Sequence, residues 1–243
     1  MTLERPRPSN PKTEFRESLN GWFSEKDIRQ IMKSWTLASL AHVGQFRKTT
    51  KEPFFVHPLS VANELLAAGI RDADVICGAF LHDTAEDTLL FGYEKTMRYT
   101  EYIQGVWEFV AEEFNPDVAD MVVSLTEPPS IDEEKDGIVA DEVDFFTKAQ
   151  AKKKKEDLLE HATPKGAIIK LGDRLHNSKT FYKDDEHLTP KEKIAETRKL
   201  VPMLAEIASQ EYPEATEILV AQIYAALDDM EAEWHLSPGK SNA

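Results

Sequence analysis

The sequence has a single cysteine and no long hydrophobic run. Cys77 has no second cysteine to pair with, so an internal disulfide is excluded and a reducing compartment is expected. No stretch is long and apolar enough to cross a membrane, and the N-terminal segment MTLERPRPSNPK lacks the apolar centre of a signal peptide. We therefore expect a cytoplasmic protein with no membrane partner.

Positive charge is also scarce. The 243 residues include 29 lysines and arginines against 44 aspartates and glutamates, which gives a formal net charge of −15. Proteins that bind nucleic acid or anionic membranes need clustered basic residues, so neither partner is expected here. A small anionic substrate remains compatible with this composition if a local basic cluster or a metal ion holds it. The sequence does not indicate an oligomeric state.

The alternating pattern of β-strands is not evident, whereas helical patterns follow one another from Thr13 onward. Ser24 is a suitable N-cap for one helix, and Pro58, Pro116 and Pro164 suit the first turns of three others. These signals predict an all-α fold in one domain.

The clearest interruption is TEPPSIDEEKDG at 126–137, whose prolines and acidic residues predict a surface loop. Residues 141–161, which include four consecutive lysines, read as an exposed helix. The expected organisation is a flexible arm over 1–12, a domain over 13–230 with an insert of about 127–160, and a tail over 231–243.

The stretch GAFLHDTAED at 78–87 places polar groups directly after a small apolar run. Burying a charged group is costly unless it is paired or binds a metal. On one continuous helix, His82 would share a face with Glu86, and Asp83 with Asp87, because residues four apart are neighbours. An imidazole nitrogen and a carboxylate oxygen from His82 and Asp83 would then be available to one ion.

Two further candidate ligands also follow apolar segments. His57 comes after Pro53-Phe54-Phe55-Val56, and Asp173 comes after Ile168-Ile169-Lys170-Leu171-Gly172. With His82 and Asp83 they would form a mixed nitrogen and oxygen site, which suits Mn, Fe or Zn. The alternative is that these are hydrogen-bonded core residues, and spacing alone does not decide between the two.

Four segments in one order carry a resemblance to a known family. They are HVGQFRK at 42–48, EPFFVHP at 52–58, GAFLHDTAEDT at 78–88 and IKLGDRLHN at 169–177. Together they resemble the hydrolase domain of the RelA/SpoT family, the HD-type metal enzymes that degrade (p)ppGpp. The resemblance covers roughly residues 25–205 and implies an HD-domain helical bundle. Because no segment resembles the family's synthetase or regulatory parts, a single-domain alarmone hydrolase is implied.

The resemblance also implies roles for residues. The family's metal ligands fall on the same four candidates, His57, His82, Asp83 and Asp173, and its usual metal is Mn²⁺. Its catalytic acidic pair, which positions and deprotonates the attacking water, falls on the two carboxylates that complete the set, Glu86 and Asp87. A carboxylate beside a metal-activated water can accept its proton.

Other residues match the family's nucleotide pocket. Arg47 matches a residue that packs on the guanine base, and a planar guanidinium suits such stacking. Lys48 could face a phosphate, Asn177 matches a residue that lines the nucleoside pocket, and Thr180 is close by in sequence. Arg174 is either a phosphate ligand or part of a structural ion pair. Two histidines are expected to be structural, His42 as a brace and His176 by packing or capping.

Two departures from the family pattern bear on these expectations. The chain reads RKTTKEPF at 47–54 where the family reads roughly RKSGEPY, so the loop beside the substrate is longer and has no glycine. Gly172 replaces a typical Ala, at a cost in helix stability.

The implied reaction is metal-dependent hydrolysis of the 3′-pyrophosphate of (p)ppGpp, giving GDP or GTP and pyrophosphate. One alternative is an HD hydrolase of a related nucleotide, such as ppApp, pppApp or the 2′-phosphate of NADPH. Another is a catalytically silent regulator that binds a nucleotide.

Overall fold

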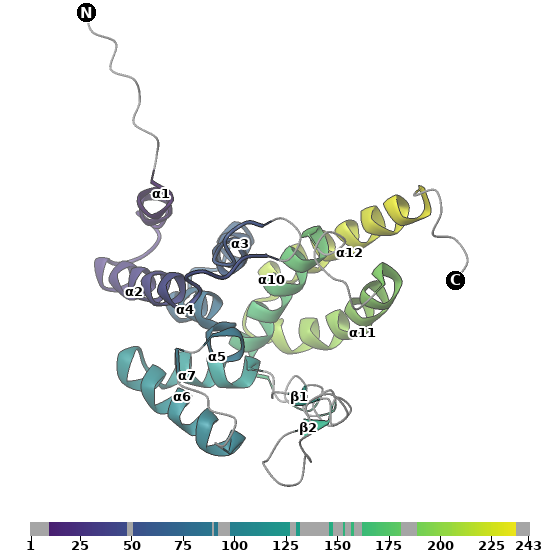
Figure 1. Ribbon diagram of the computed structural model, residues 1–243. Helices are drawn as coiled ribbons and strands as arrows, with labels where there is room; N and C mark the ends of the chain where they lie inside the picture. The colour runs from purple at the N-terminus through teal and green to yellow at the C-terminus, as the bar shows by residue number, and fades with distance from the viewer. Residues whose placement is uncertain are drawn as a thin grey trace, which may run out of the picture.

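The computed structural model is built almost entirely of helices (Figure 1). The described residues are 10–47, 51–88, 90–91, 98–126, 130–131, 146–147, 153, 157, 162–180 and 189–236. Most of the expected insert, Lys48, and the outer parts of the expected arm and tail lie outside them. The expected all-α class is confirmed.

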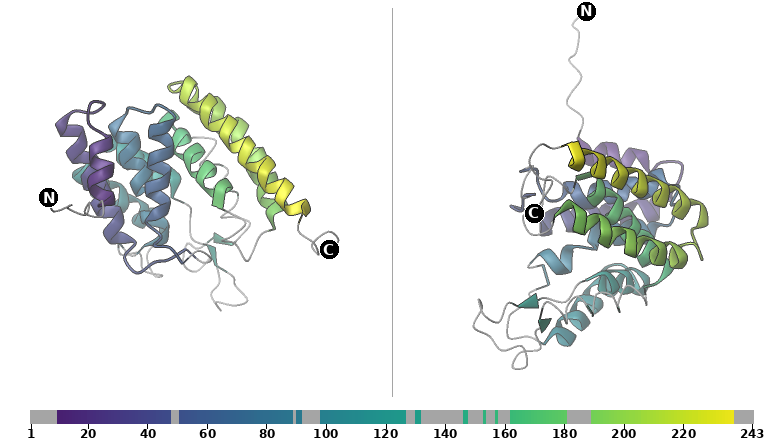
Figure 2. Two further views of the ribbon diagram at one scale, coloured as in Figure 1. Left: turned by 90° about the horizontal axis from the view of Figure 1, so that it is seen from above. Right: turned by 90° about the vertical axis from the view of Figure 1, so that its right-hand side faces the viewer.

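The core is formed by helices that carry apolar residues on their inner faces. The helices are α1 (Pro11–Ser18), α2 (Glu25–Ala41), α3 (Val56–Ala67), α4 (Ala73–Leu81), α5 (Thr84–Asp87), α6 (Tyr99–Glu113), α7 (Pro116–Leu125), α10 (Pro164–Thr180), α11 (Pro190–Ala208) and α12 (Pro213–Leu236). Helix α10 packs against α3, α4, α7, α11 and α12 and is therefore the centre of the fold. Helices α11 and α12 lie side by side over it (Figure 2).

Local sequence signals explain where several helices begin. Ser24 and Asp27 form a reciprocal capping box at the start of α2, and Thr189 and Glu192 form another at the start of α11. The Asp72 side chain caps α4 by accepting hydrogen bonds from two backbone amides. Each cap supplies partners for amides that the helix itself leaves unpaired.

Gly172 lies where α10 approaches α3 closely. A Cβ atom at this position would stand 3.2 Å from two carbon atoms of Leu65 and 3.3 Å from Val61 Cγ1. These spacings are tighter than ordinary contact, so the glycine permits the close approach. Glycine is expected to lower helix stability at this position, but it also lets α3 and α10 pack closely beside Asp173.

Two local predictions are wrong. Residues 78–87 do not form one helix, because α4 ends at Leu81 and a turn at His82 and Asp83 precedes the short α5. Within the expected helix 141–161, Phe146–Thr147 is instead strand β2, which pairs in parallel with β1 (Ser130–Ile131). Pairing with a segment distant in sequence overrides a helical pattern that only local residues suggest.

The described helices are too short or too polar to span a membrane. None of them contains an 18-residue stretch apolar enough to cross a bilayer.

Cys77 is fully buried in α4, and burial raises the pKa of its thiol to about 12. Only the thiolate reacts with alkylating agents. We expect native protein to resist iodoacetamide at pH 8 and to be alkylated fully in denaturant. Mass spectrometry along a urea series checks this, and the labelled fraction should follow the loss of helical circular dichroism. Rapid labelling without denaturant would contradict the buried position.

Candidate metal centre

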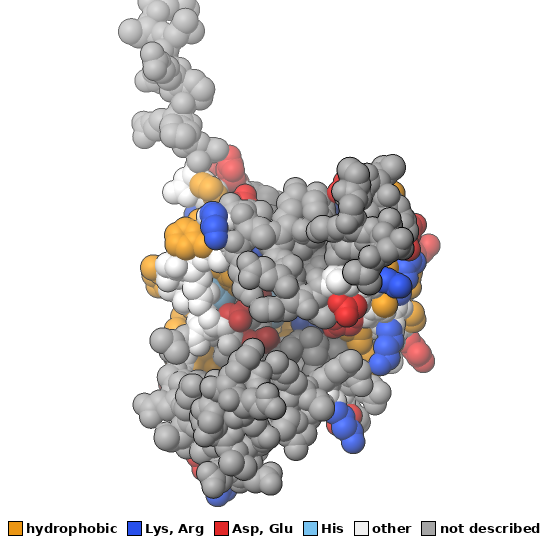
Figure 3. Space-filling model, turned by 45° about the vertical axis from the view of Figure 1, so that its right-hand side comes forward, with side chains coloured by type: hydrophobic (Ala, Val, Ile, Leu, Met, Phe, Trp, Pro, Cys, Tyr) orange, Lys and Arg blue, Asp and Glu red, His pale blue; other side chains and the backbone are white. Residues whose placement is uncertain are grey.

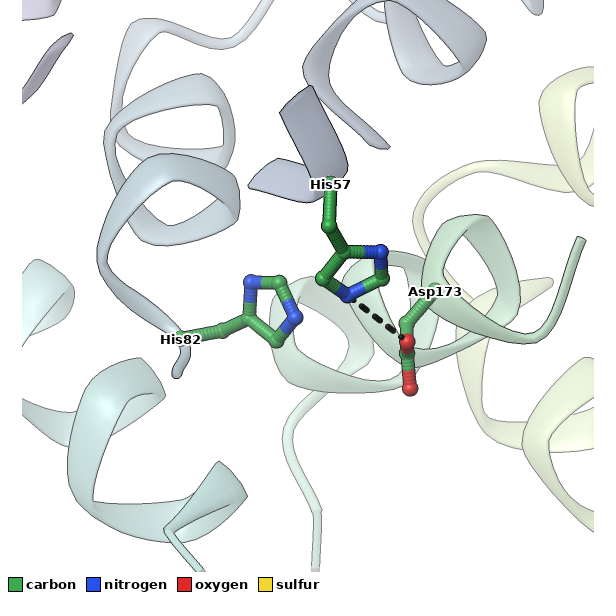
Figure 4. A group of neighbouring side chains, drawn as sticks. All are labelled: His57, His82 and Asp173. Carbon is green, nitrogen blue, oxygen red and sulfur yellow. Dashed lines mark ion pairs between the residues drawn. The ribbon is translucent and has the colours of Figure 1, made fainter. Parts of the chain in front are cut away.

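Three side chains from three separate helical segments converge in the interior. His57 comes from the first turn of α3, His82 from the turn after α4, and Asp173 from the middle of α10 (Figure 4). All three are buried, and one donor atom of each lies within 4.8 Å of the other two. His57 Nε2 is 3.3 Å from Asp173 Oδ1. The arrangement therefore brings together three of the four predicted ligands.

Asp83 adds the fourth predicted group. Its Oδ2 atom is 3.2 Å from His57 Nε2, and its Oδ1 atom is 3.0 Å from His82 Nε2. The turn after Leu81 makes this possible, because Asp83 leaves the helix and can face the same ion as its neighbour. The expected pairing of His82 with Glu86 and of Asp83 with Asp87 on one continuous helix is therefore wrong. His82 and Asp83 instead converge at the end of α4.

The ring of His82 is oriented as a metal ligand would be. Its Nδ1 atom donates to the backbone carbonyl of Ala79, at 2.8 Å, so in the neutral ring Nε2 carries the lone pair. Nε2 is buried and has no well-directed hydrogen bond among the described residues, although Asp83 Oδ1 is close. A buried acceptor without a donor is costly unless something else binds it, and a cation would do so.

The carboxylate of Asp173 is held on both sides by its own helix. Lys170 Nζ is 3.0 Å from Oδ2, and Asn177 Nδ2 donates to Oδ1 at 2.6 Å. Lys170, Asp173 and Asn177 are spaced by three and four residues, which places them on one face of α10. Asn177, predicted to line the nucleoside pocket, here also fixes the direction of a predicted metal ligand.

The charges of the site are those of a cation-binding centre. Burial alone would raise the pKa of Asp83, but the His82 and His57 rings hold it well below its usual range. Burial acts likewise on Asp173, where Lys170 and His57 outweigh it and lower the pKa. Burial would lower the pKa of His57, yet hydrogen bonds to Asp173 and Asp83 raise it to about 9. Two ionised carboxylates therefore surround the position of His57 Nε2.

A third histidine, His176, supports the centre from α10. Its Nδ1 atom lies 2.7 Å from Nδ1 of His57, and both rings are buried. Burial, followed by the charges of His57 and Arg47, lowers the pKa of His176 to about 3. The sequence predicted only packing or capping here. The spacing of three residues from Asp173 was the signal that could have linked His176 to the site.

Predicted nucleotide-binding residues lie beside this centre. Arg47 Nη2 donates to Thr180 Oγ1 at 3.3 Å, and the guanidinium carbon is 5.8 Å from the ring centre of Phe54. Thr180 in turn donates to the His176 carbonyl at 3.0 Å. Arg47 and Thr180 are thus brought together although 133 residues separate them in sequence.

Arg174 has a different setting from these residues. It is buried, with Nη1 3.9 Å from Glu196 Oε1 and Nε 3.8 Å from Asp173 Oδ2. These contacts favour the structural ion pair over the phosphate ligand. Lys48 lies outside the described residues.

Glu86 and Asp87, the predicted catalytic pair, are exposed on α5 directly after Asp83. Gln45 Nε2 donates to the Asp87 carbonyl at 2.6 Å, and Gln45 Oε1 is 2.7 Å from Nδ1 of the buried His42. His42 also stacks on Phe54, with ring centres 4.6 Å apart. His42 and Gln45 therefore brace the end of α5, a role that the sequence suggested for His42 alone.

Acidic and histidine side chains are neighbours on one face of the molecule. On the face drawn in Figure 3, acidic side chains gather near the middle, beside a patch of histidine surface. Imidazole nitrogens and carboxylate oxygens suit a divalent ion such as Mn, Fe or Zn. The two buried histidines, His57 and His82, and the carboxylates of Asp83 and Asp173 fit such an ion.

The buried ion pair between Lys170 and Asp173 yields a stability prediction. Lys170→Met leaves the Asp173 charge without its nearest cation, and we expect the free energy of unfolding to fall by about 3 kcal/mol. Urea denaturation of metal-free protein measures it. Arg16→Met, which breaks the exposed pair with Glu25, is the matched control and should cost less than about 1 kcal/mol. Equal losses in the two variants would contradict the argument.

The sequence of this chain is similar to those of several known proteins. A GTP pyrophosphokinase of Streptomyces coelicolor is 32% identical over 156 residues, which are 63% of this chain and 15% of that protein. A guanosine-3′,5′-bis(diphosphate) 3′-pyrophosphohydrolase of Aquifex aeolicus is 30% identical over 154 residues, again 63% of this chain and 18% of that protein. The chain thus matches less than a fifth of the length of these two relatives.

A solved structure has a similar fold. It is described as a metazoan ortholog of SpoT that hydrolyzes ppGpp and plays a role in starvation responses. The two structures superpose with a TM-score of 0.57 and 21% identity, over 86% of this chain and 97% of the other.

The family comparison covers most of the chain. The HD domain pattern matches residues 34–208, which include His57, His82, Asp83 and Asp173. Together with the RelA/SpoT-type relatives, this match confirms the resemblance that the four sequence segments indicated. The chain belongs to the HD domain family.

Proposed function

We propose that the protein hydrolyses the 3′-pyrophosphate of (p)ppGpp at a divalent metal ion. The observation that carries the proposal is the convergence of His57, His82, Asp83 and Asp173 beside the contact between Arg47 and Thr180. The chain of contacts from Arg47 through Thr180 and His176 to His57 supports one substrate that would contact both an ion and a base-stacking group. A reducing cytoplasm is the proposed location, which suits the free, buried thiol of Cys77.

His57, His82, Asp83 and Asp173 would hold the ion, with Mn²⁺ as the proposed occupant. Bound there, a divalent ion would supply Lewis acidity to a phosphoryl oxygen and make a water molecule more acidic. Lys170 and Asn177 hold the Asp173 carboxylate in the direction that faces His57.

Glu86 and Asp87 are proposed to orient the attacking water and to take its proton. In support, both residues are exposed and lie on α5, the short helix that follows Asp83. The water oxygen forms a bond to the phosphorus attached to the ribose 3′ oxygen, and the bond from that phosphorus to the 3′ oxygen breaks. The 3′ oxygen gains a proton, so the products are GDP or GTP and pyrophosphate.

The nucleoside would be recognised by Arg47, with Asn177 and Thr180 nearby. The guanidinium already lies near the Phe54 ring on one side, so a base on its other side would complete a stack. Stacking alone tolerates any purine. Adenine alarmones or NADPH are therefore the alternative substrates, and the extended loop RKTTKEPF adjoins this position in sequence.

The names of the relatives include both synthesis and hydrolysis of ppGpp. Those names belong to whole proteins, of which the matched segments are a fifth or less. What the matched part of this chain contains is a cluster of imidazoles and carboxylates for one ion. This chemistry favours hydrolysis. A silent nucleotide-binding regulator is disfavoured by the presence of both Glu86 and Asp87.

The decisive assay is a substrate panel. Chelator-treated protein is incubated with and without Mn²⁺ in the presence of ppGpp, ppApp, NADPH, GTP or ATP, and the products are separated by anion exchange. We expect GDP and pyrophosphate from ppGpp, and only with metal. Cleavage of another compound instead would reassign the substrate. Metal binding without cleavage of any compound would favour the regulator.

Two variants separate metal binding from proton transfer. Asp83→Ala should abolish Mn²⁺ binding and activity together, because the remaining ligands lose the carboxylate that touches both histidines. Glu86→Gln should keep Mn²⁺ bound and lower kcat by about 10²–10⁴-fold. Calorimetry and initial rates measure the two effects. Glu101→Gln, an exposed site on α6, is the matched control and should retain full activity. A fully active Glu86→Gln variant would disprove the role of Glu86.

A further inference from the structure

His57 and His176 touch through the same atom of each ring. Their Nδ1 atoms are 2.7 Å apart and their ring centres 4.8 Å apart. His57 is 3% exposed and His176 is 8% exposed, so water competes little for this contact. At this distance one nitrogen must donate a hydrogen and the other must accept it.

The direction of this hydrogen bond follows from the other side of the His57 ring. Its Nε2 atom faces Asp83 at 3.2 Å and Asp173 at 3.3 Å, where the proposed ion would lie. A neutral imidazole has one protonated and one free nitrogen. If Nε2 is to offer its lone pair, Nδ1 must carry the hydrogen and His176 Nδ1 must accept it.

We propose that His176 is a positioning residue that holds His57 in the tautomer and orientation needed to bind a divalent ion. This inference rests on the metal site of the proposed function. It assigns a role to His176 that packing or capping does not include. An outer partner of this kind commonly contributes 10–100-fold to metal affinity.

The two metal-site histidines are supported in different ways. His82 donates to the carbonyl of Ala79, three residues before it, so its Nδ1 partner is local backbone. His57 relies instead on a side chain from another helix, because α10 packs against α3. The carbonyl of His176 also accepts from Thr180, the residue that contacts Arg47. His176 therefore stands between the proposed metal and base-binding groups.

The test compares two substitutions at one position. His176→Leu has a similar volume and no acceptor, whereas His176→Asn places a carbonyl oxygen near the position of the lost Nδ1. Mn²⁺ affinity is measured by electron paramagnetic resonance of the free ion, after circular dichroism has verified the fold. We expect H176L to weaken Mn²⁺ binding about 10–100-fold. We expect H176N to stay within a few-fold of the parent, and buried Ser178→Ala, on the same helix, to leave affinity unchanged.

A spectroscopic readout does not depend on these variants. In the parent protein loaded with Zn²⁺, which is diamagnetic, His57 should show a hydrogen-bonded, exchange-protected Nδ1–H in the proton NMR spectrum. A ¹⁵N-labelled imidazole assigns that proton to Nδ1. A role in packing alone would not require this signal.

Several outcomes would overturn the inference. They are parent-like Mn²⁺ affinity in folded H176L, an equal loss in folded H176N, or a His57 Nδ1 without a proton in the Zn²⁺ form. The substrate panel tests the proposed hydrolase activity independently of the role of His176. Cleavage of ppGpp with unchanged affinity in H176L would reject the role of His176 alone. Mn²⁺ binding that depends on His176, with no cleavage of any nucleotide, would reject the hydrolase alone.

Discussion

Two ionised carboxylates, Asp83 and Asp173, are held against the His57 ring inside a helical protein, and the surrounding structure must compensate their charge. Burial opposes both charges, so each carboxylate needs cationic or hydrogen-bonding partners. Lys170 and Asn177 supply them for Asp173 from the same helix. His57 faces both carboxylates and connects them. The packing of α10 against α3 and α4 brings these groups together within the apolar core.

Three of the four proposed ligands lie where regular helices end or begin. His57 is in the first turn of α3, and Asp83 belongs to the turn between α4 and α5. Only Asp173 projects from the middle of a helix. A turn lets two adjacent residues point to one place, whereas neighbours within a helix point about 100° apart. The break after Leu81 is therefore part of how the centre is built.

Much of the fold was predictable because its signals are local. The capping residues Ser24 and Asp72 and the helical apolar patterns act within a few residues, and they identify an all-α protein. The sequence could name His57 and Asp173 as candidate ligands, but it could not show that they meet. They are 116 positions apart, and only the packing of α3 against α10 brings them together. The contact between His57 and His176, the support of Asp87 by Gln45 and the strand at Phe146–Thr147 depend on partners distant in sequence. Local sequence patterns do not indicate which distant residues will be in contact.

Gly172, which has no side chain, bears on which divalent ions could fit the proposed metal site. Leu65 and Val61 rest almost on the backbone of α10 there, one residue before Asp173. Because His57 is on α3 and Asp173 is on α10, the separation of the two helices would affect the radius of an ion that both residues could bind. Divalent ions differ in radius by tenths of an ångström, the same order as the displacement that a methyl group at position 172 would require. An aliphatic contact that does not touch the proposed ion would therefore influence which ions fit between the two residues.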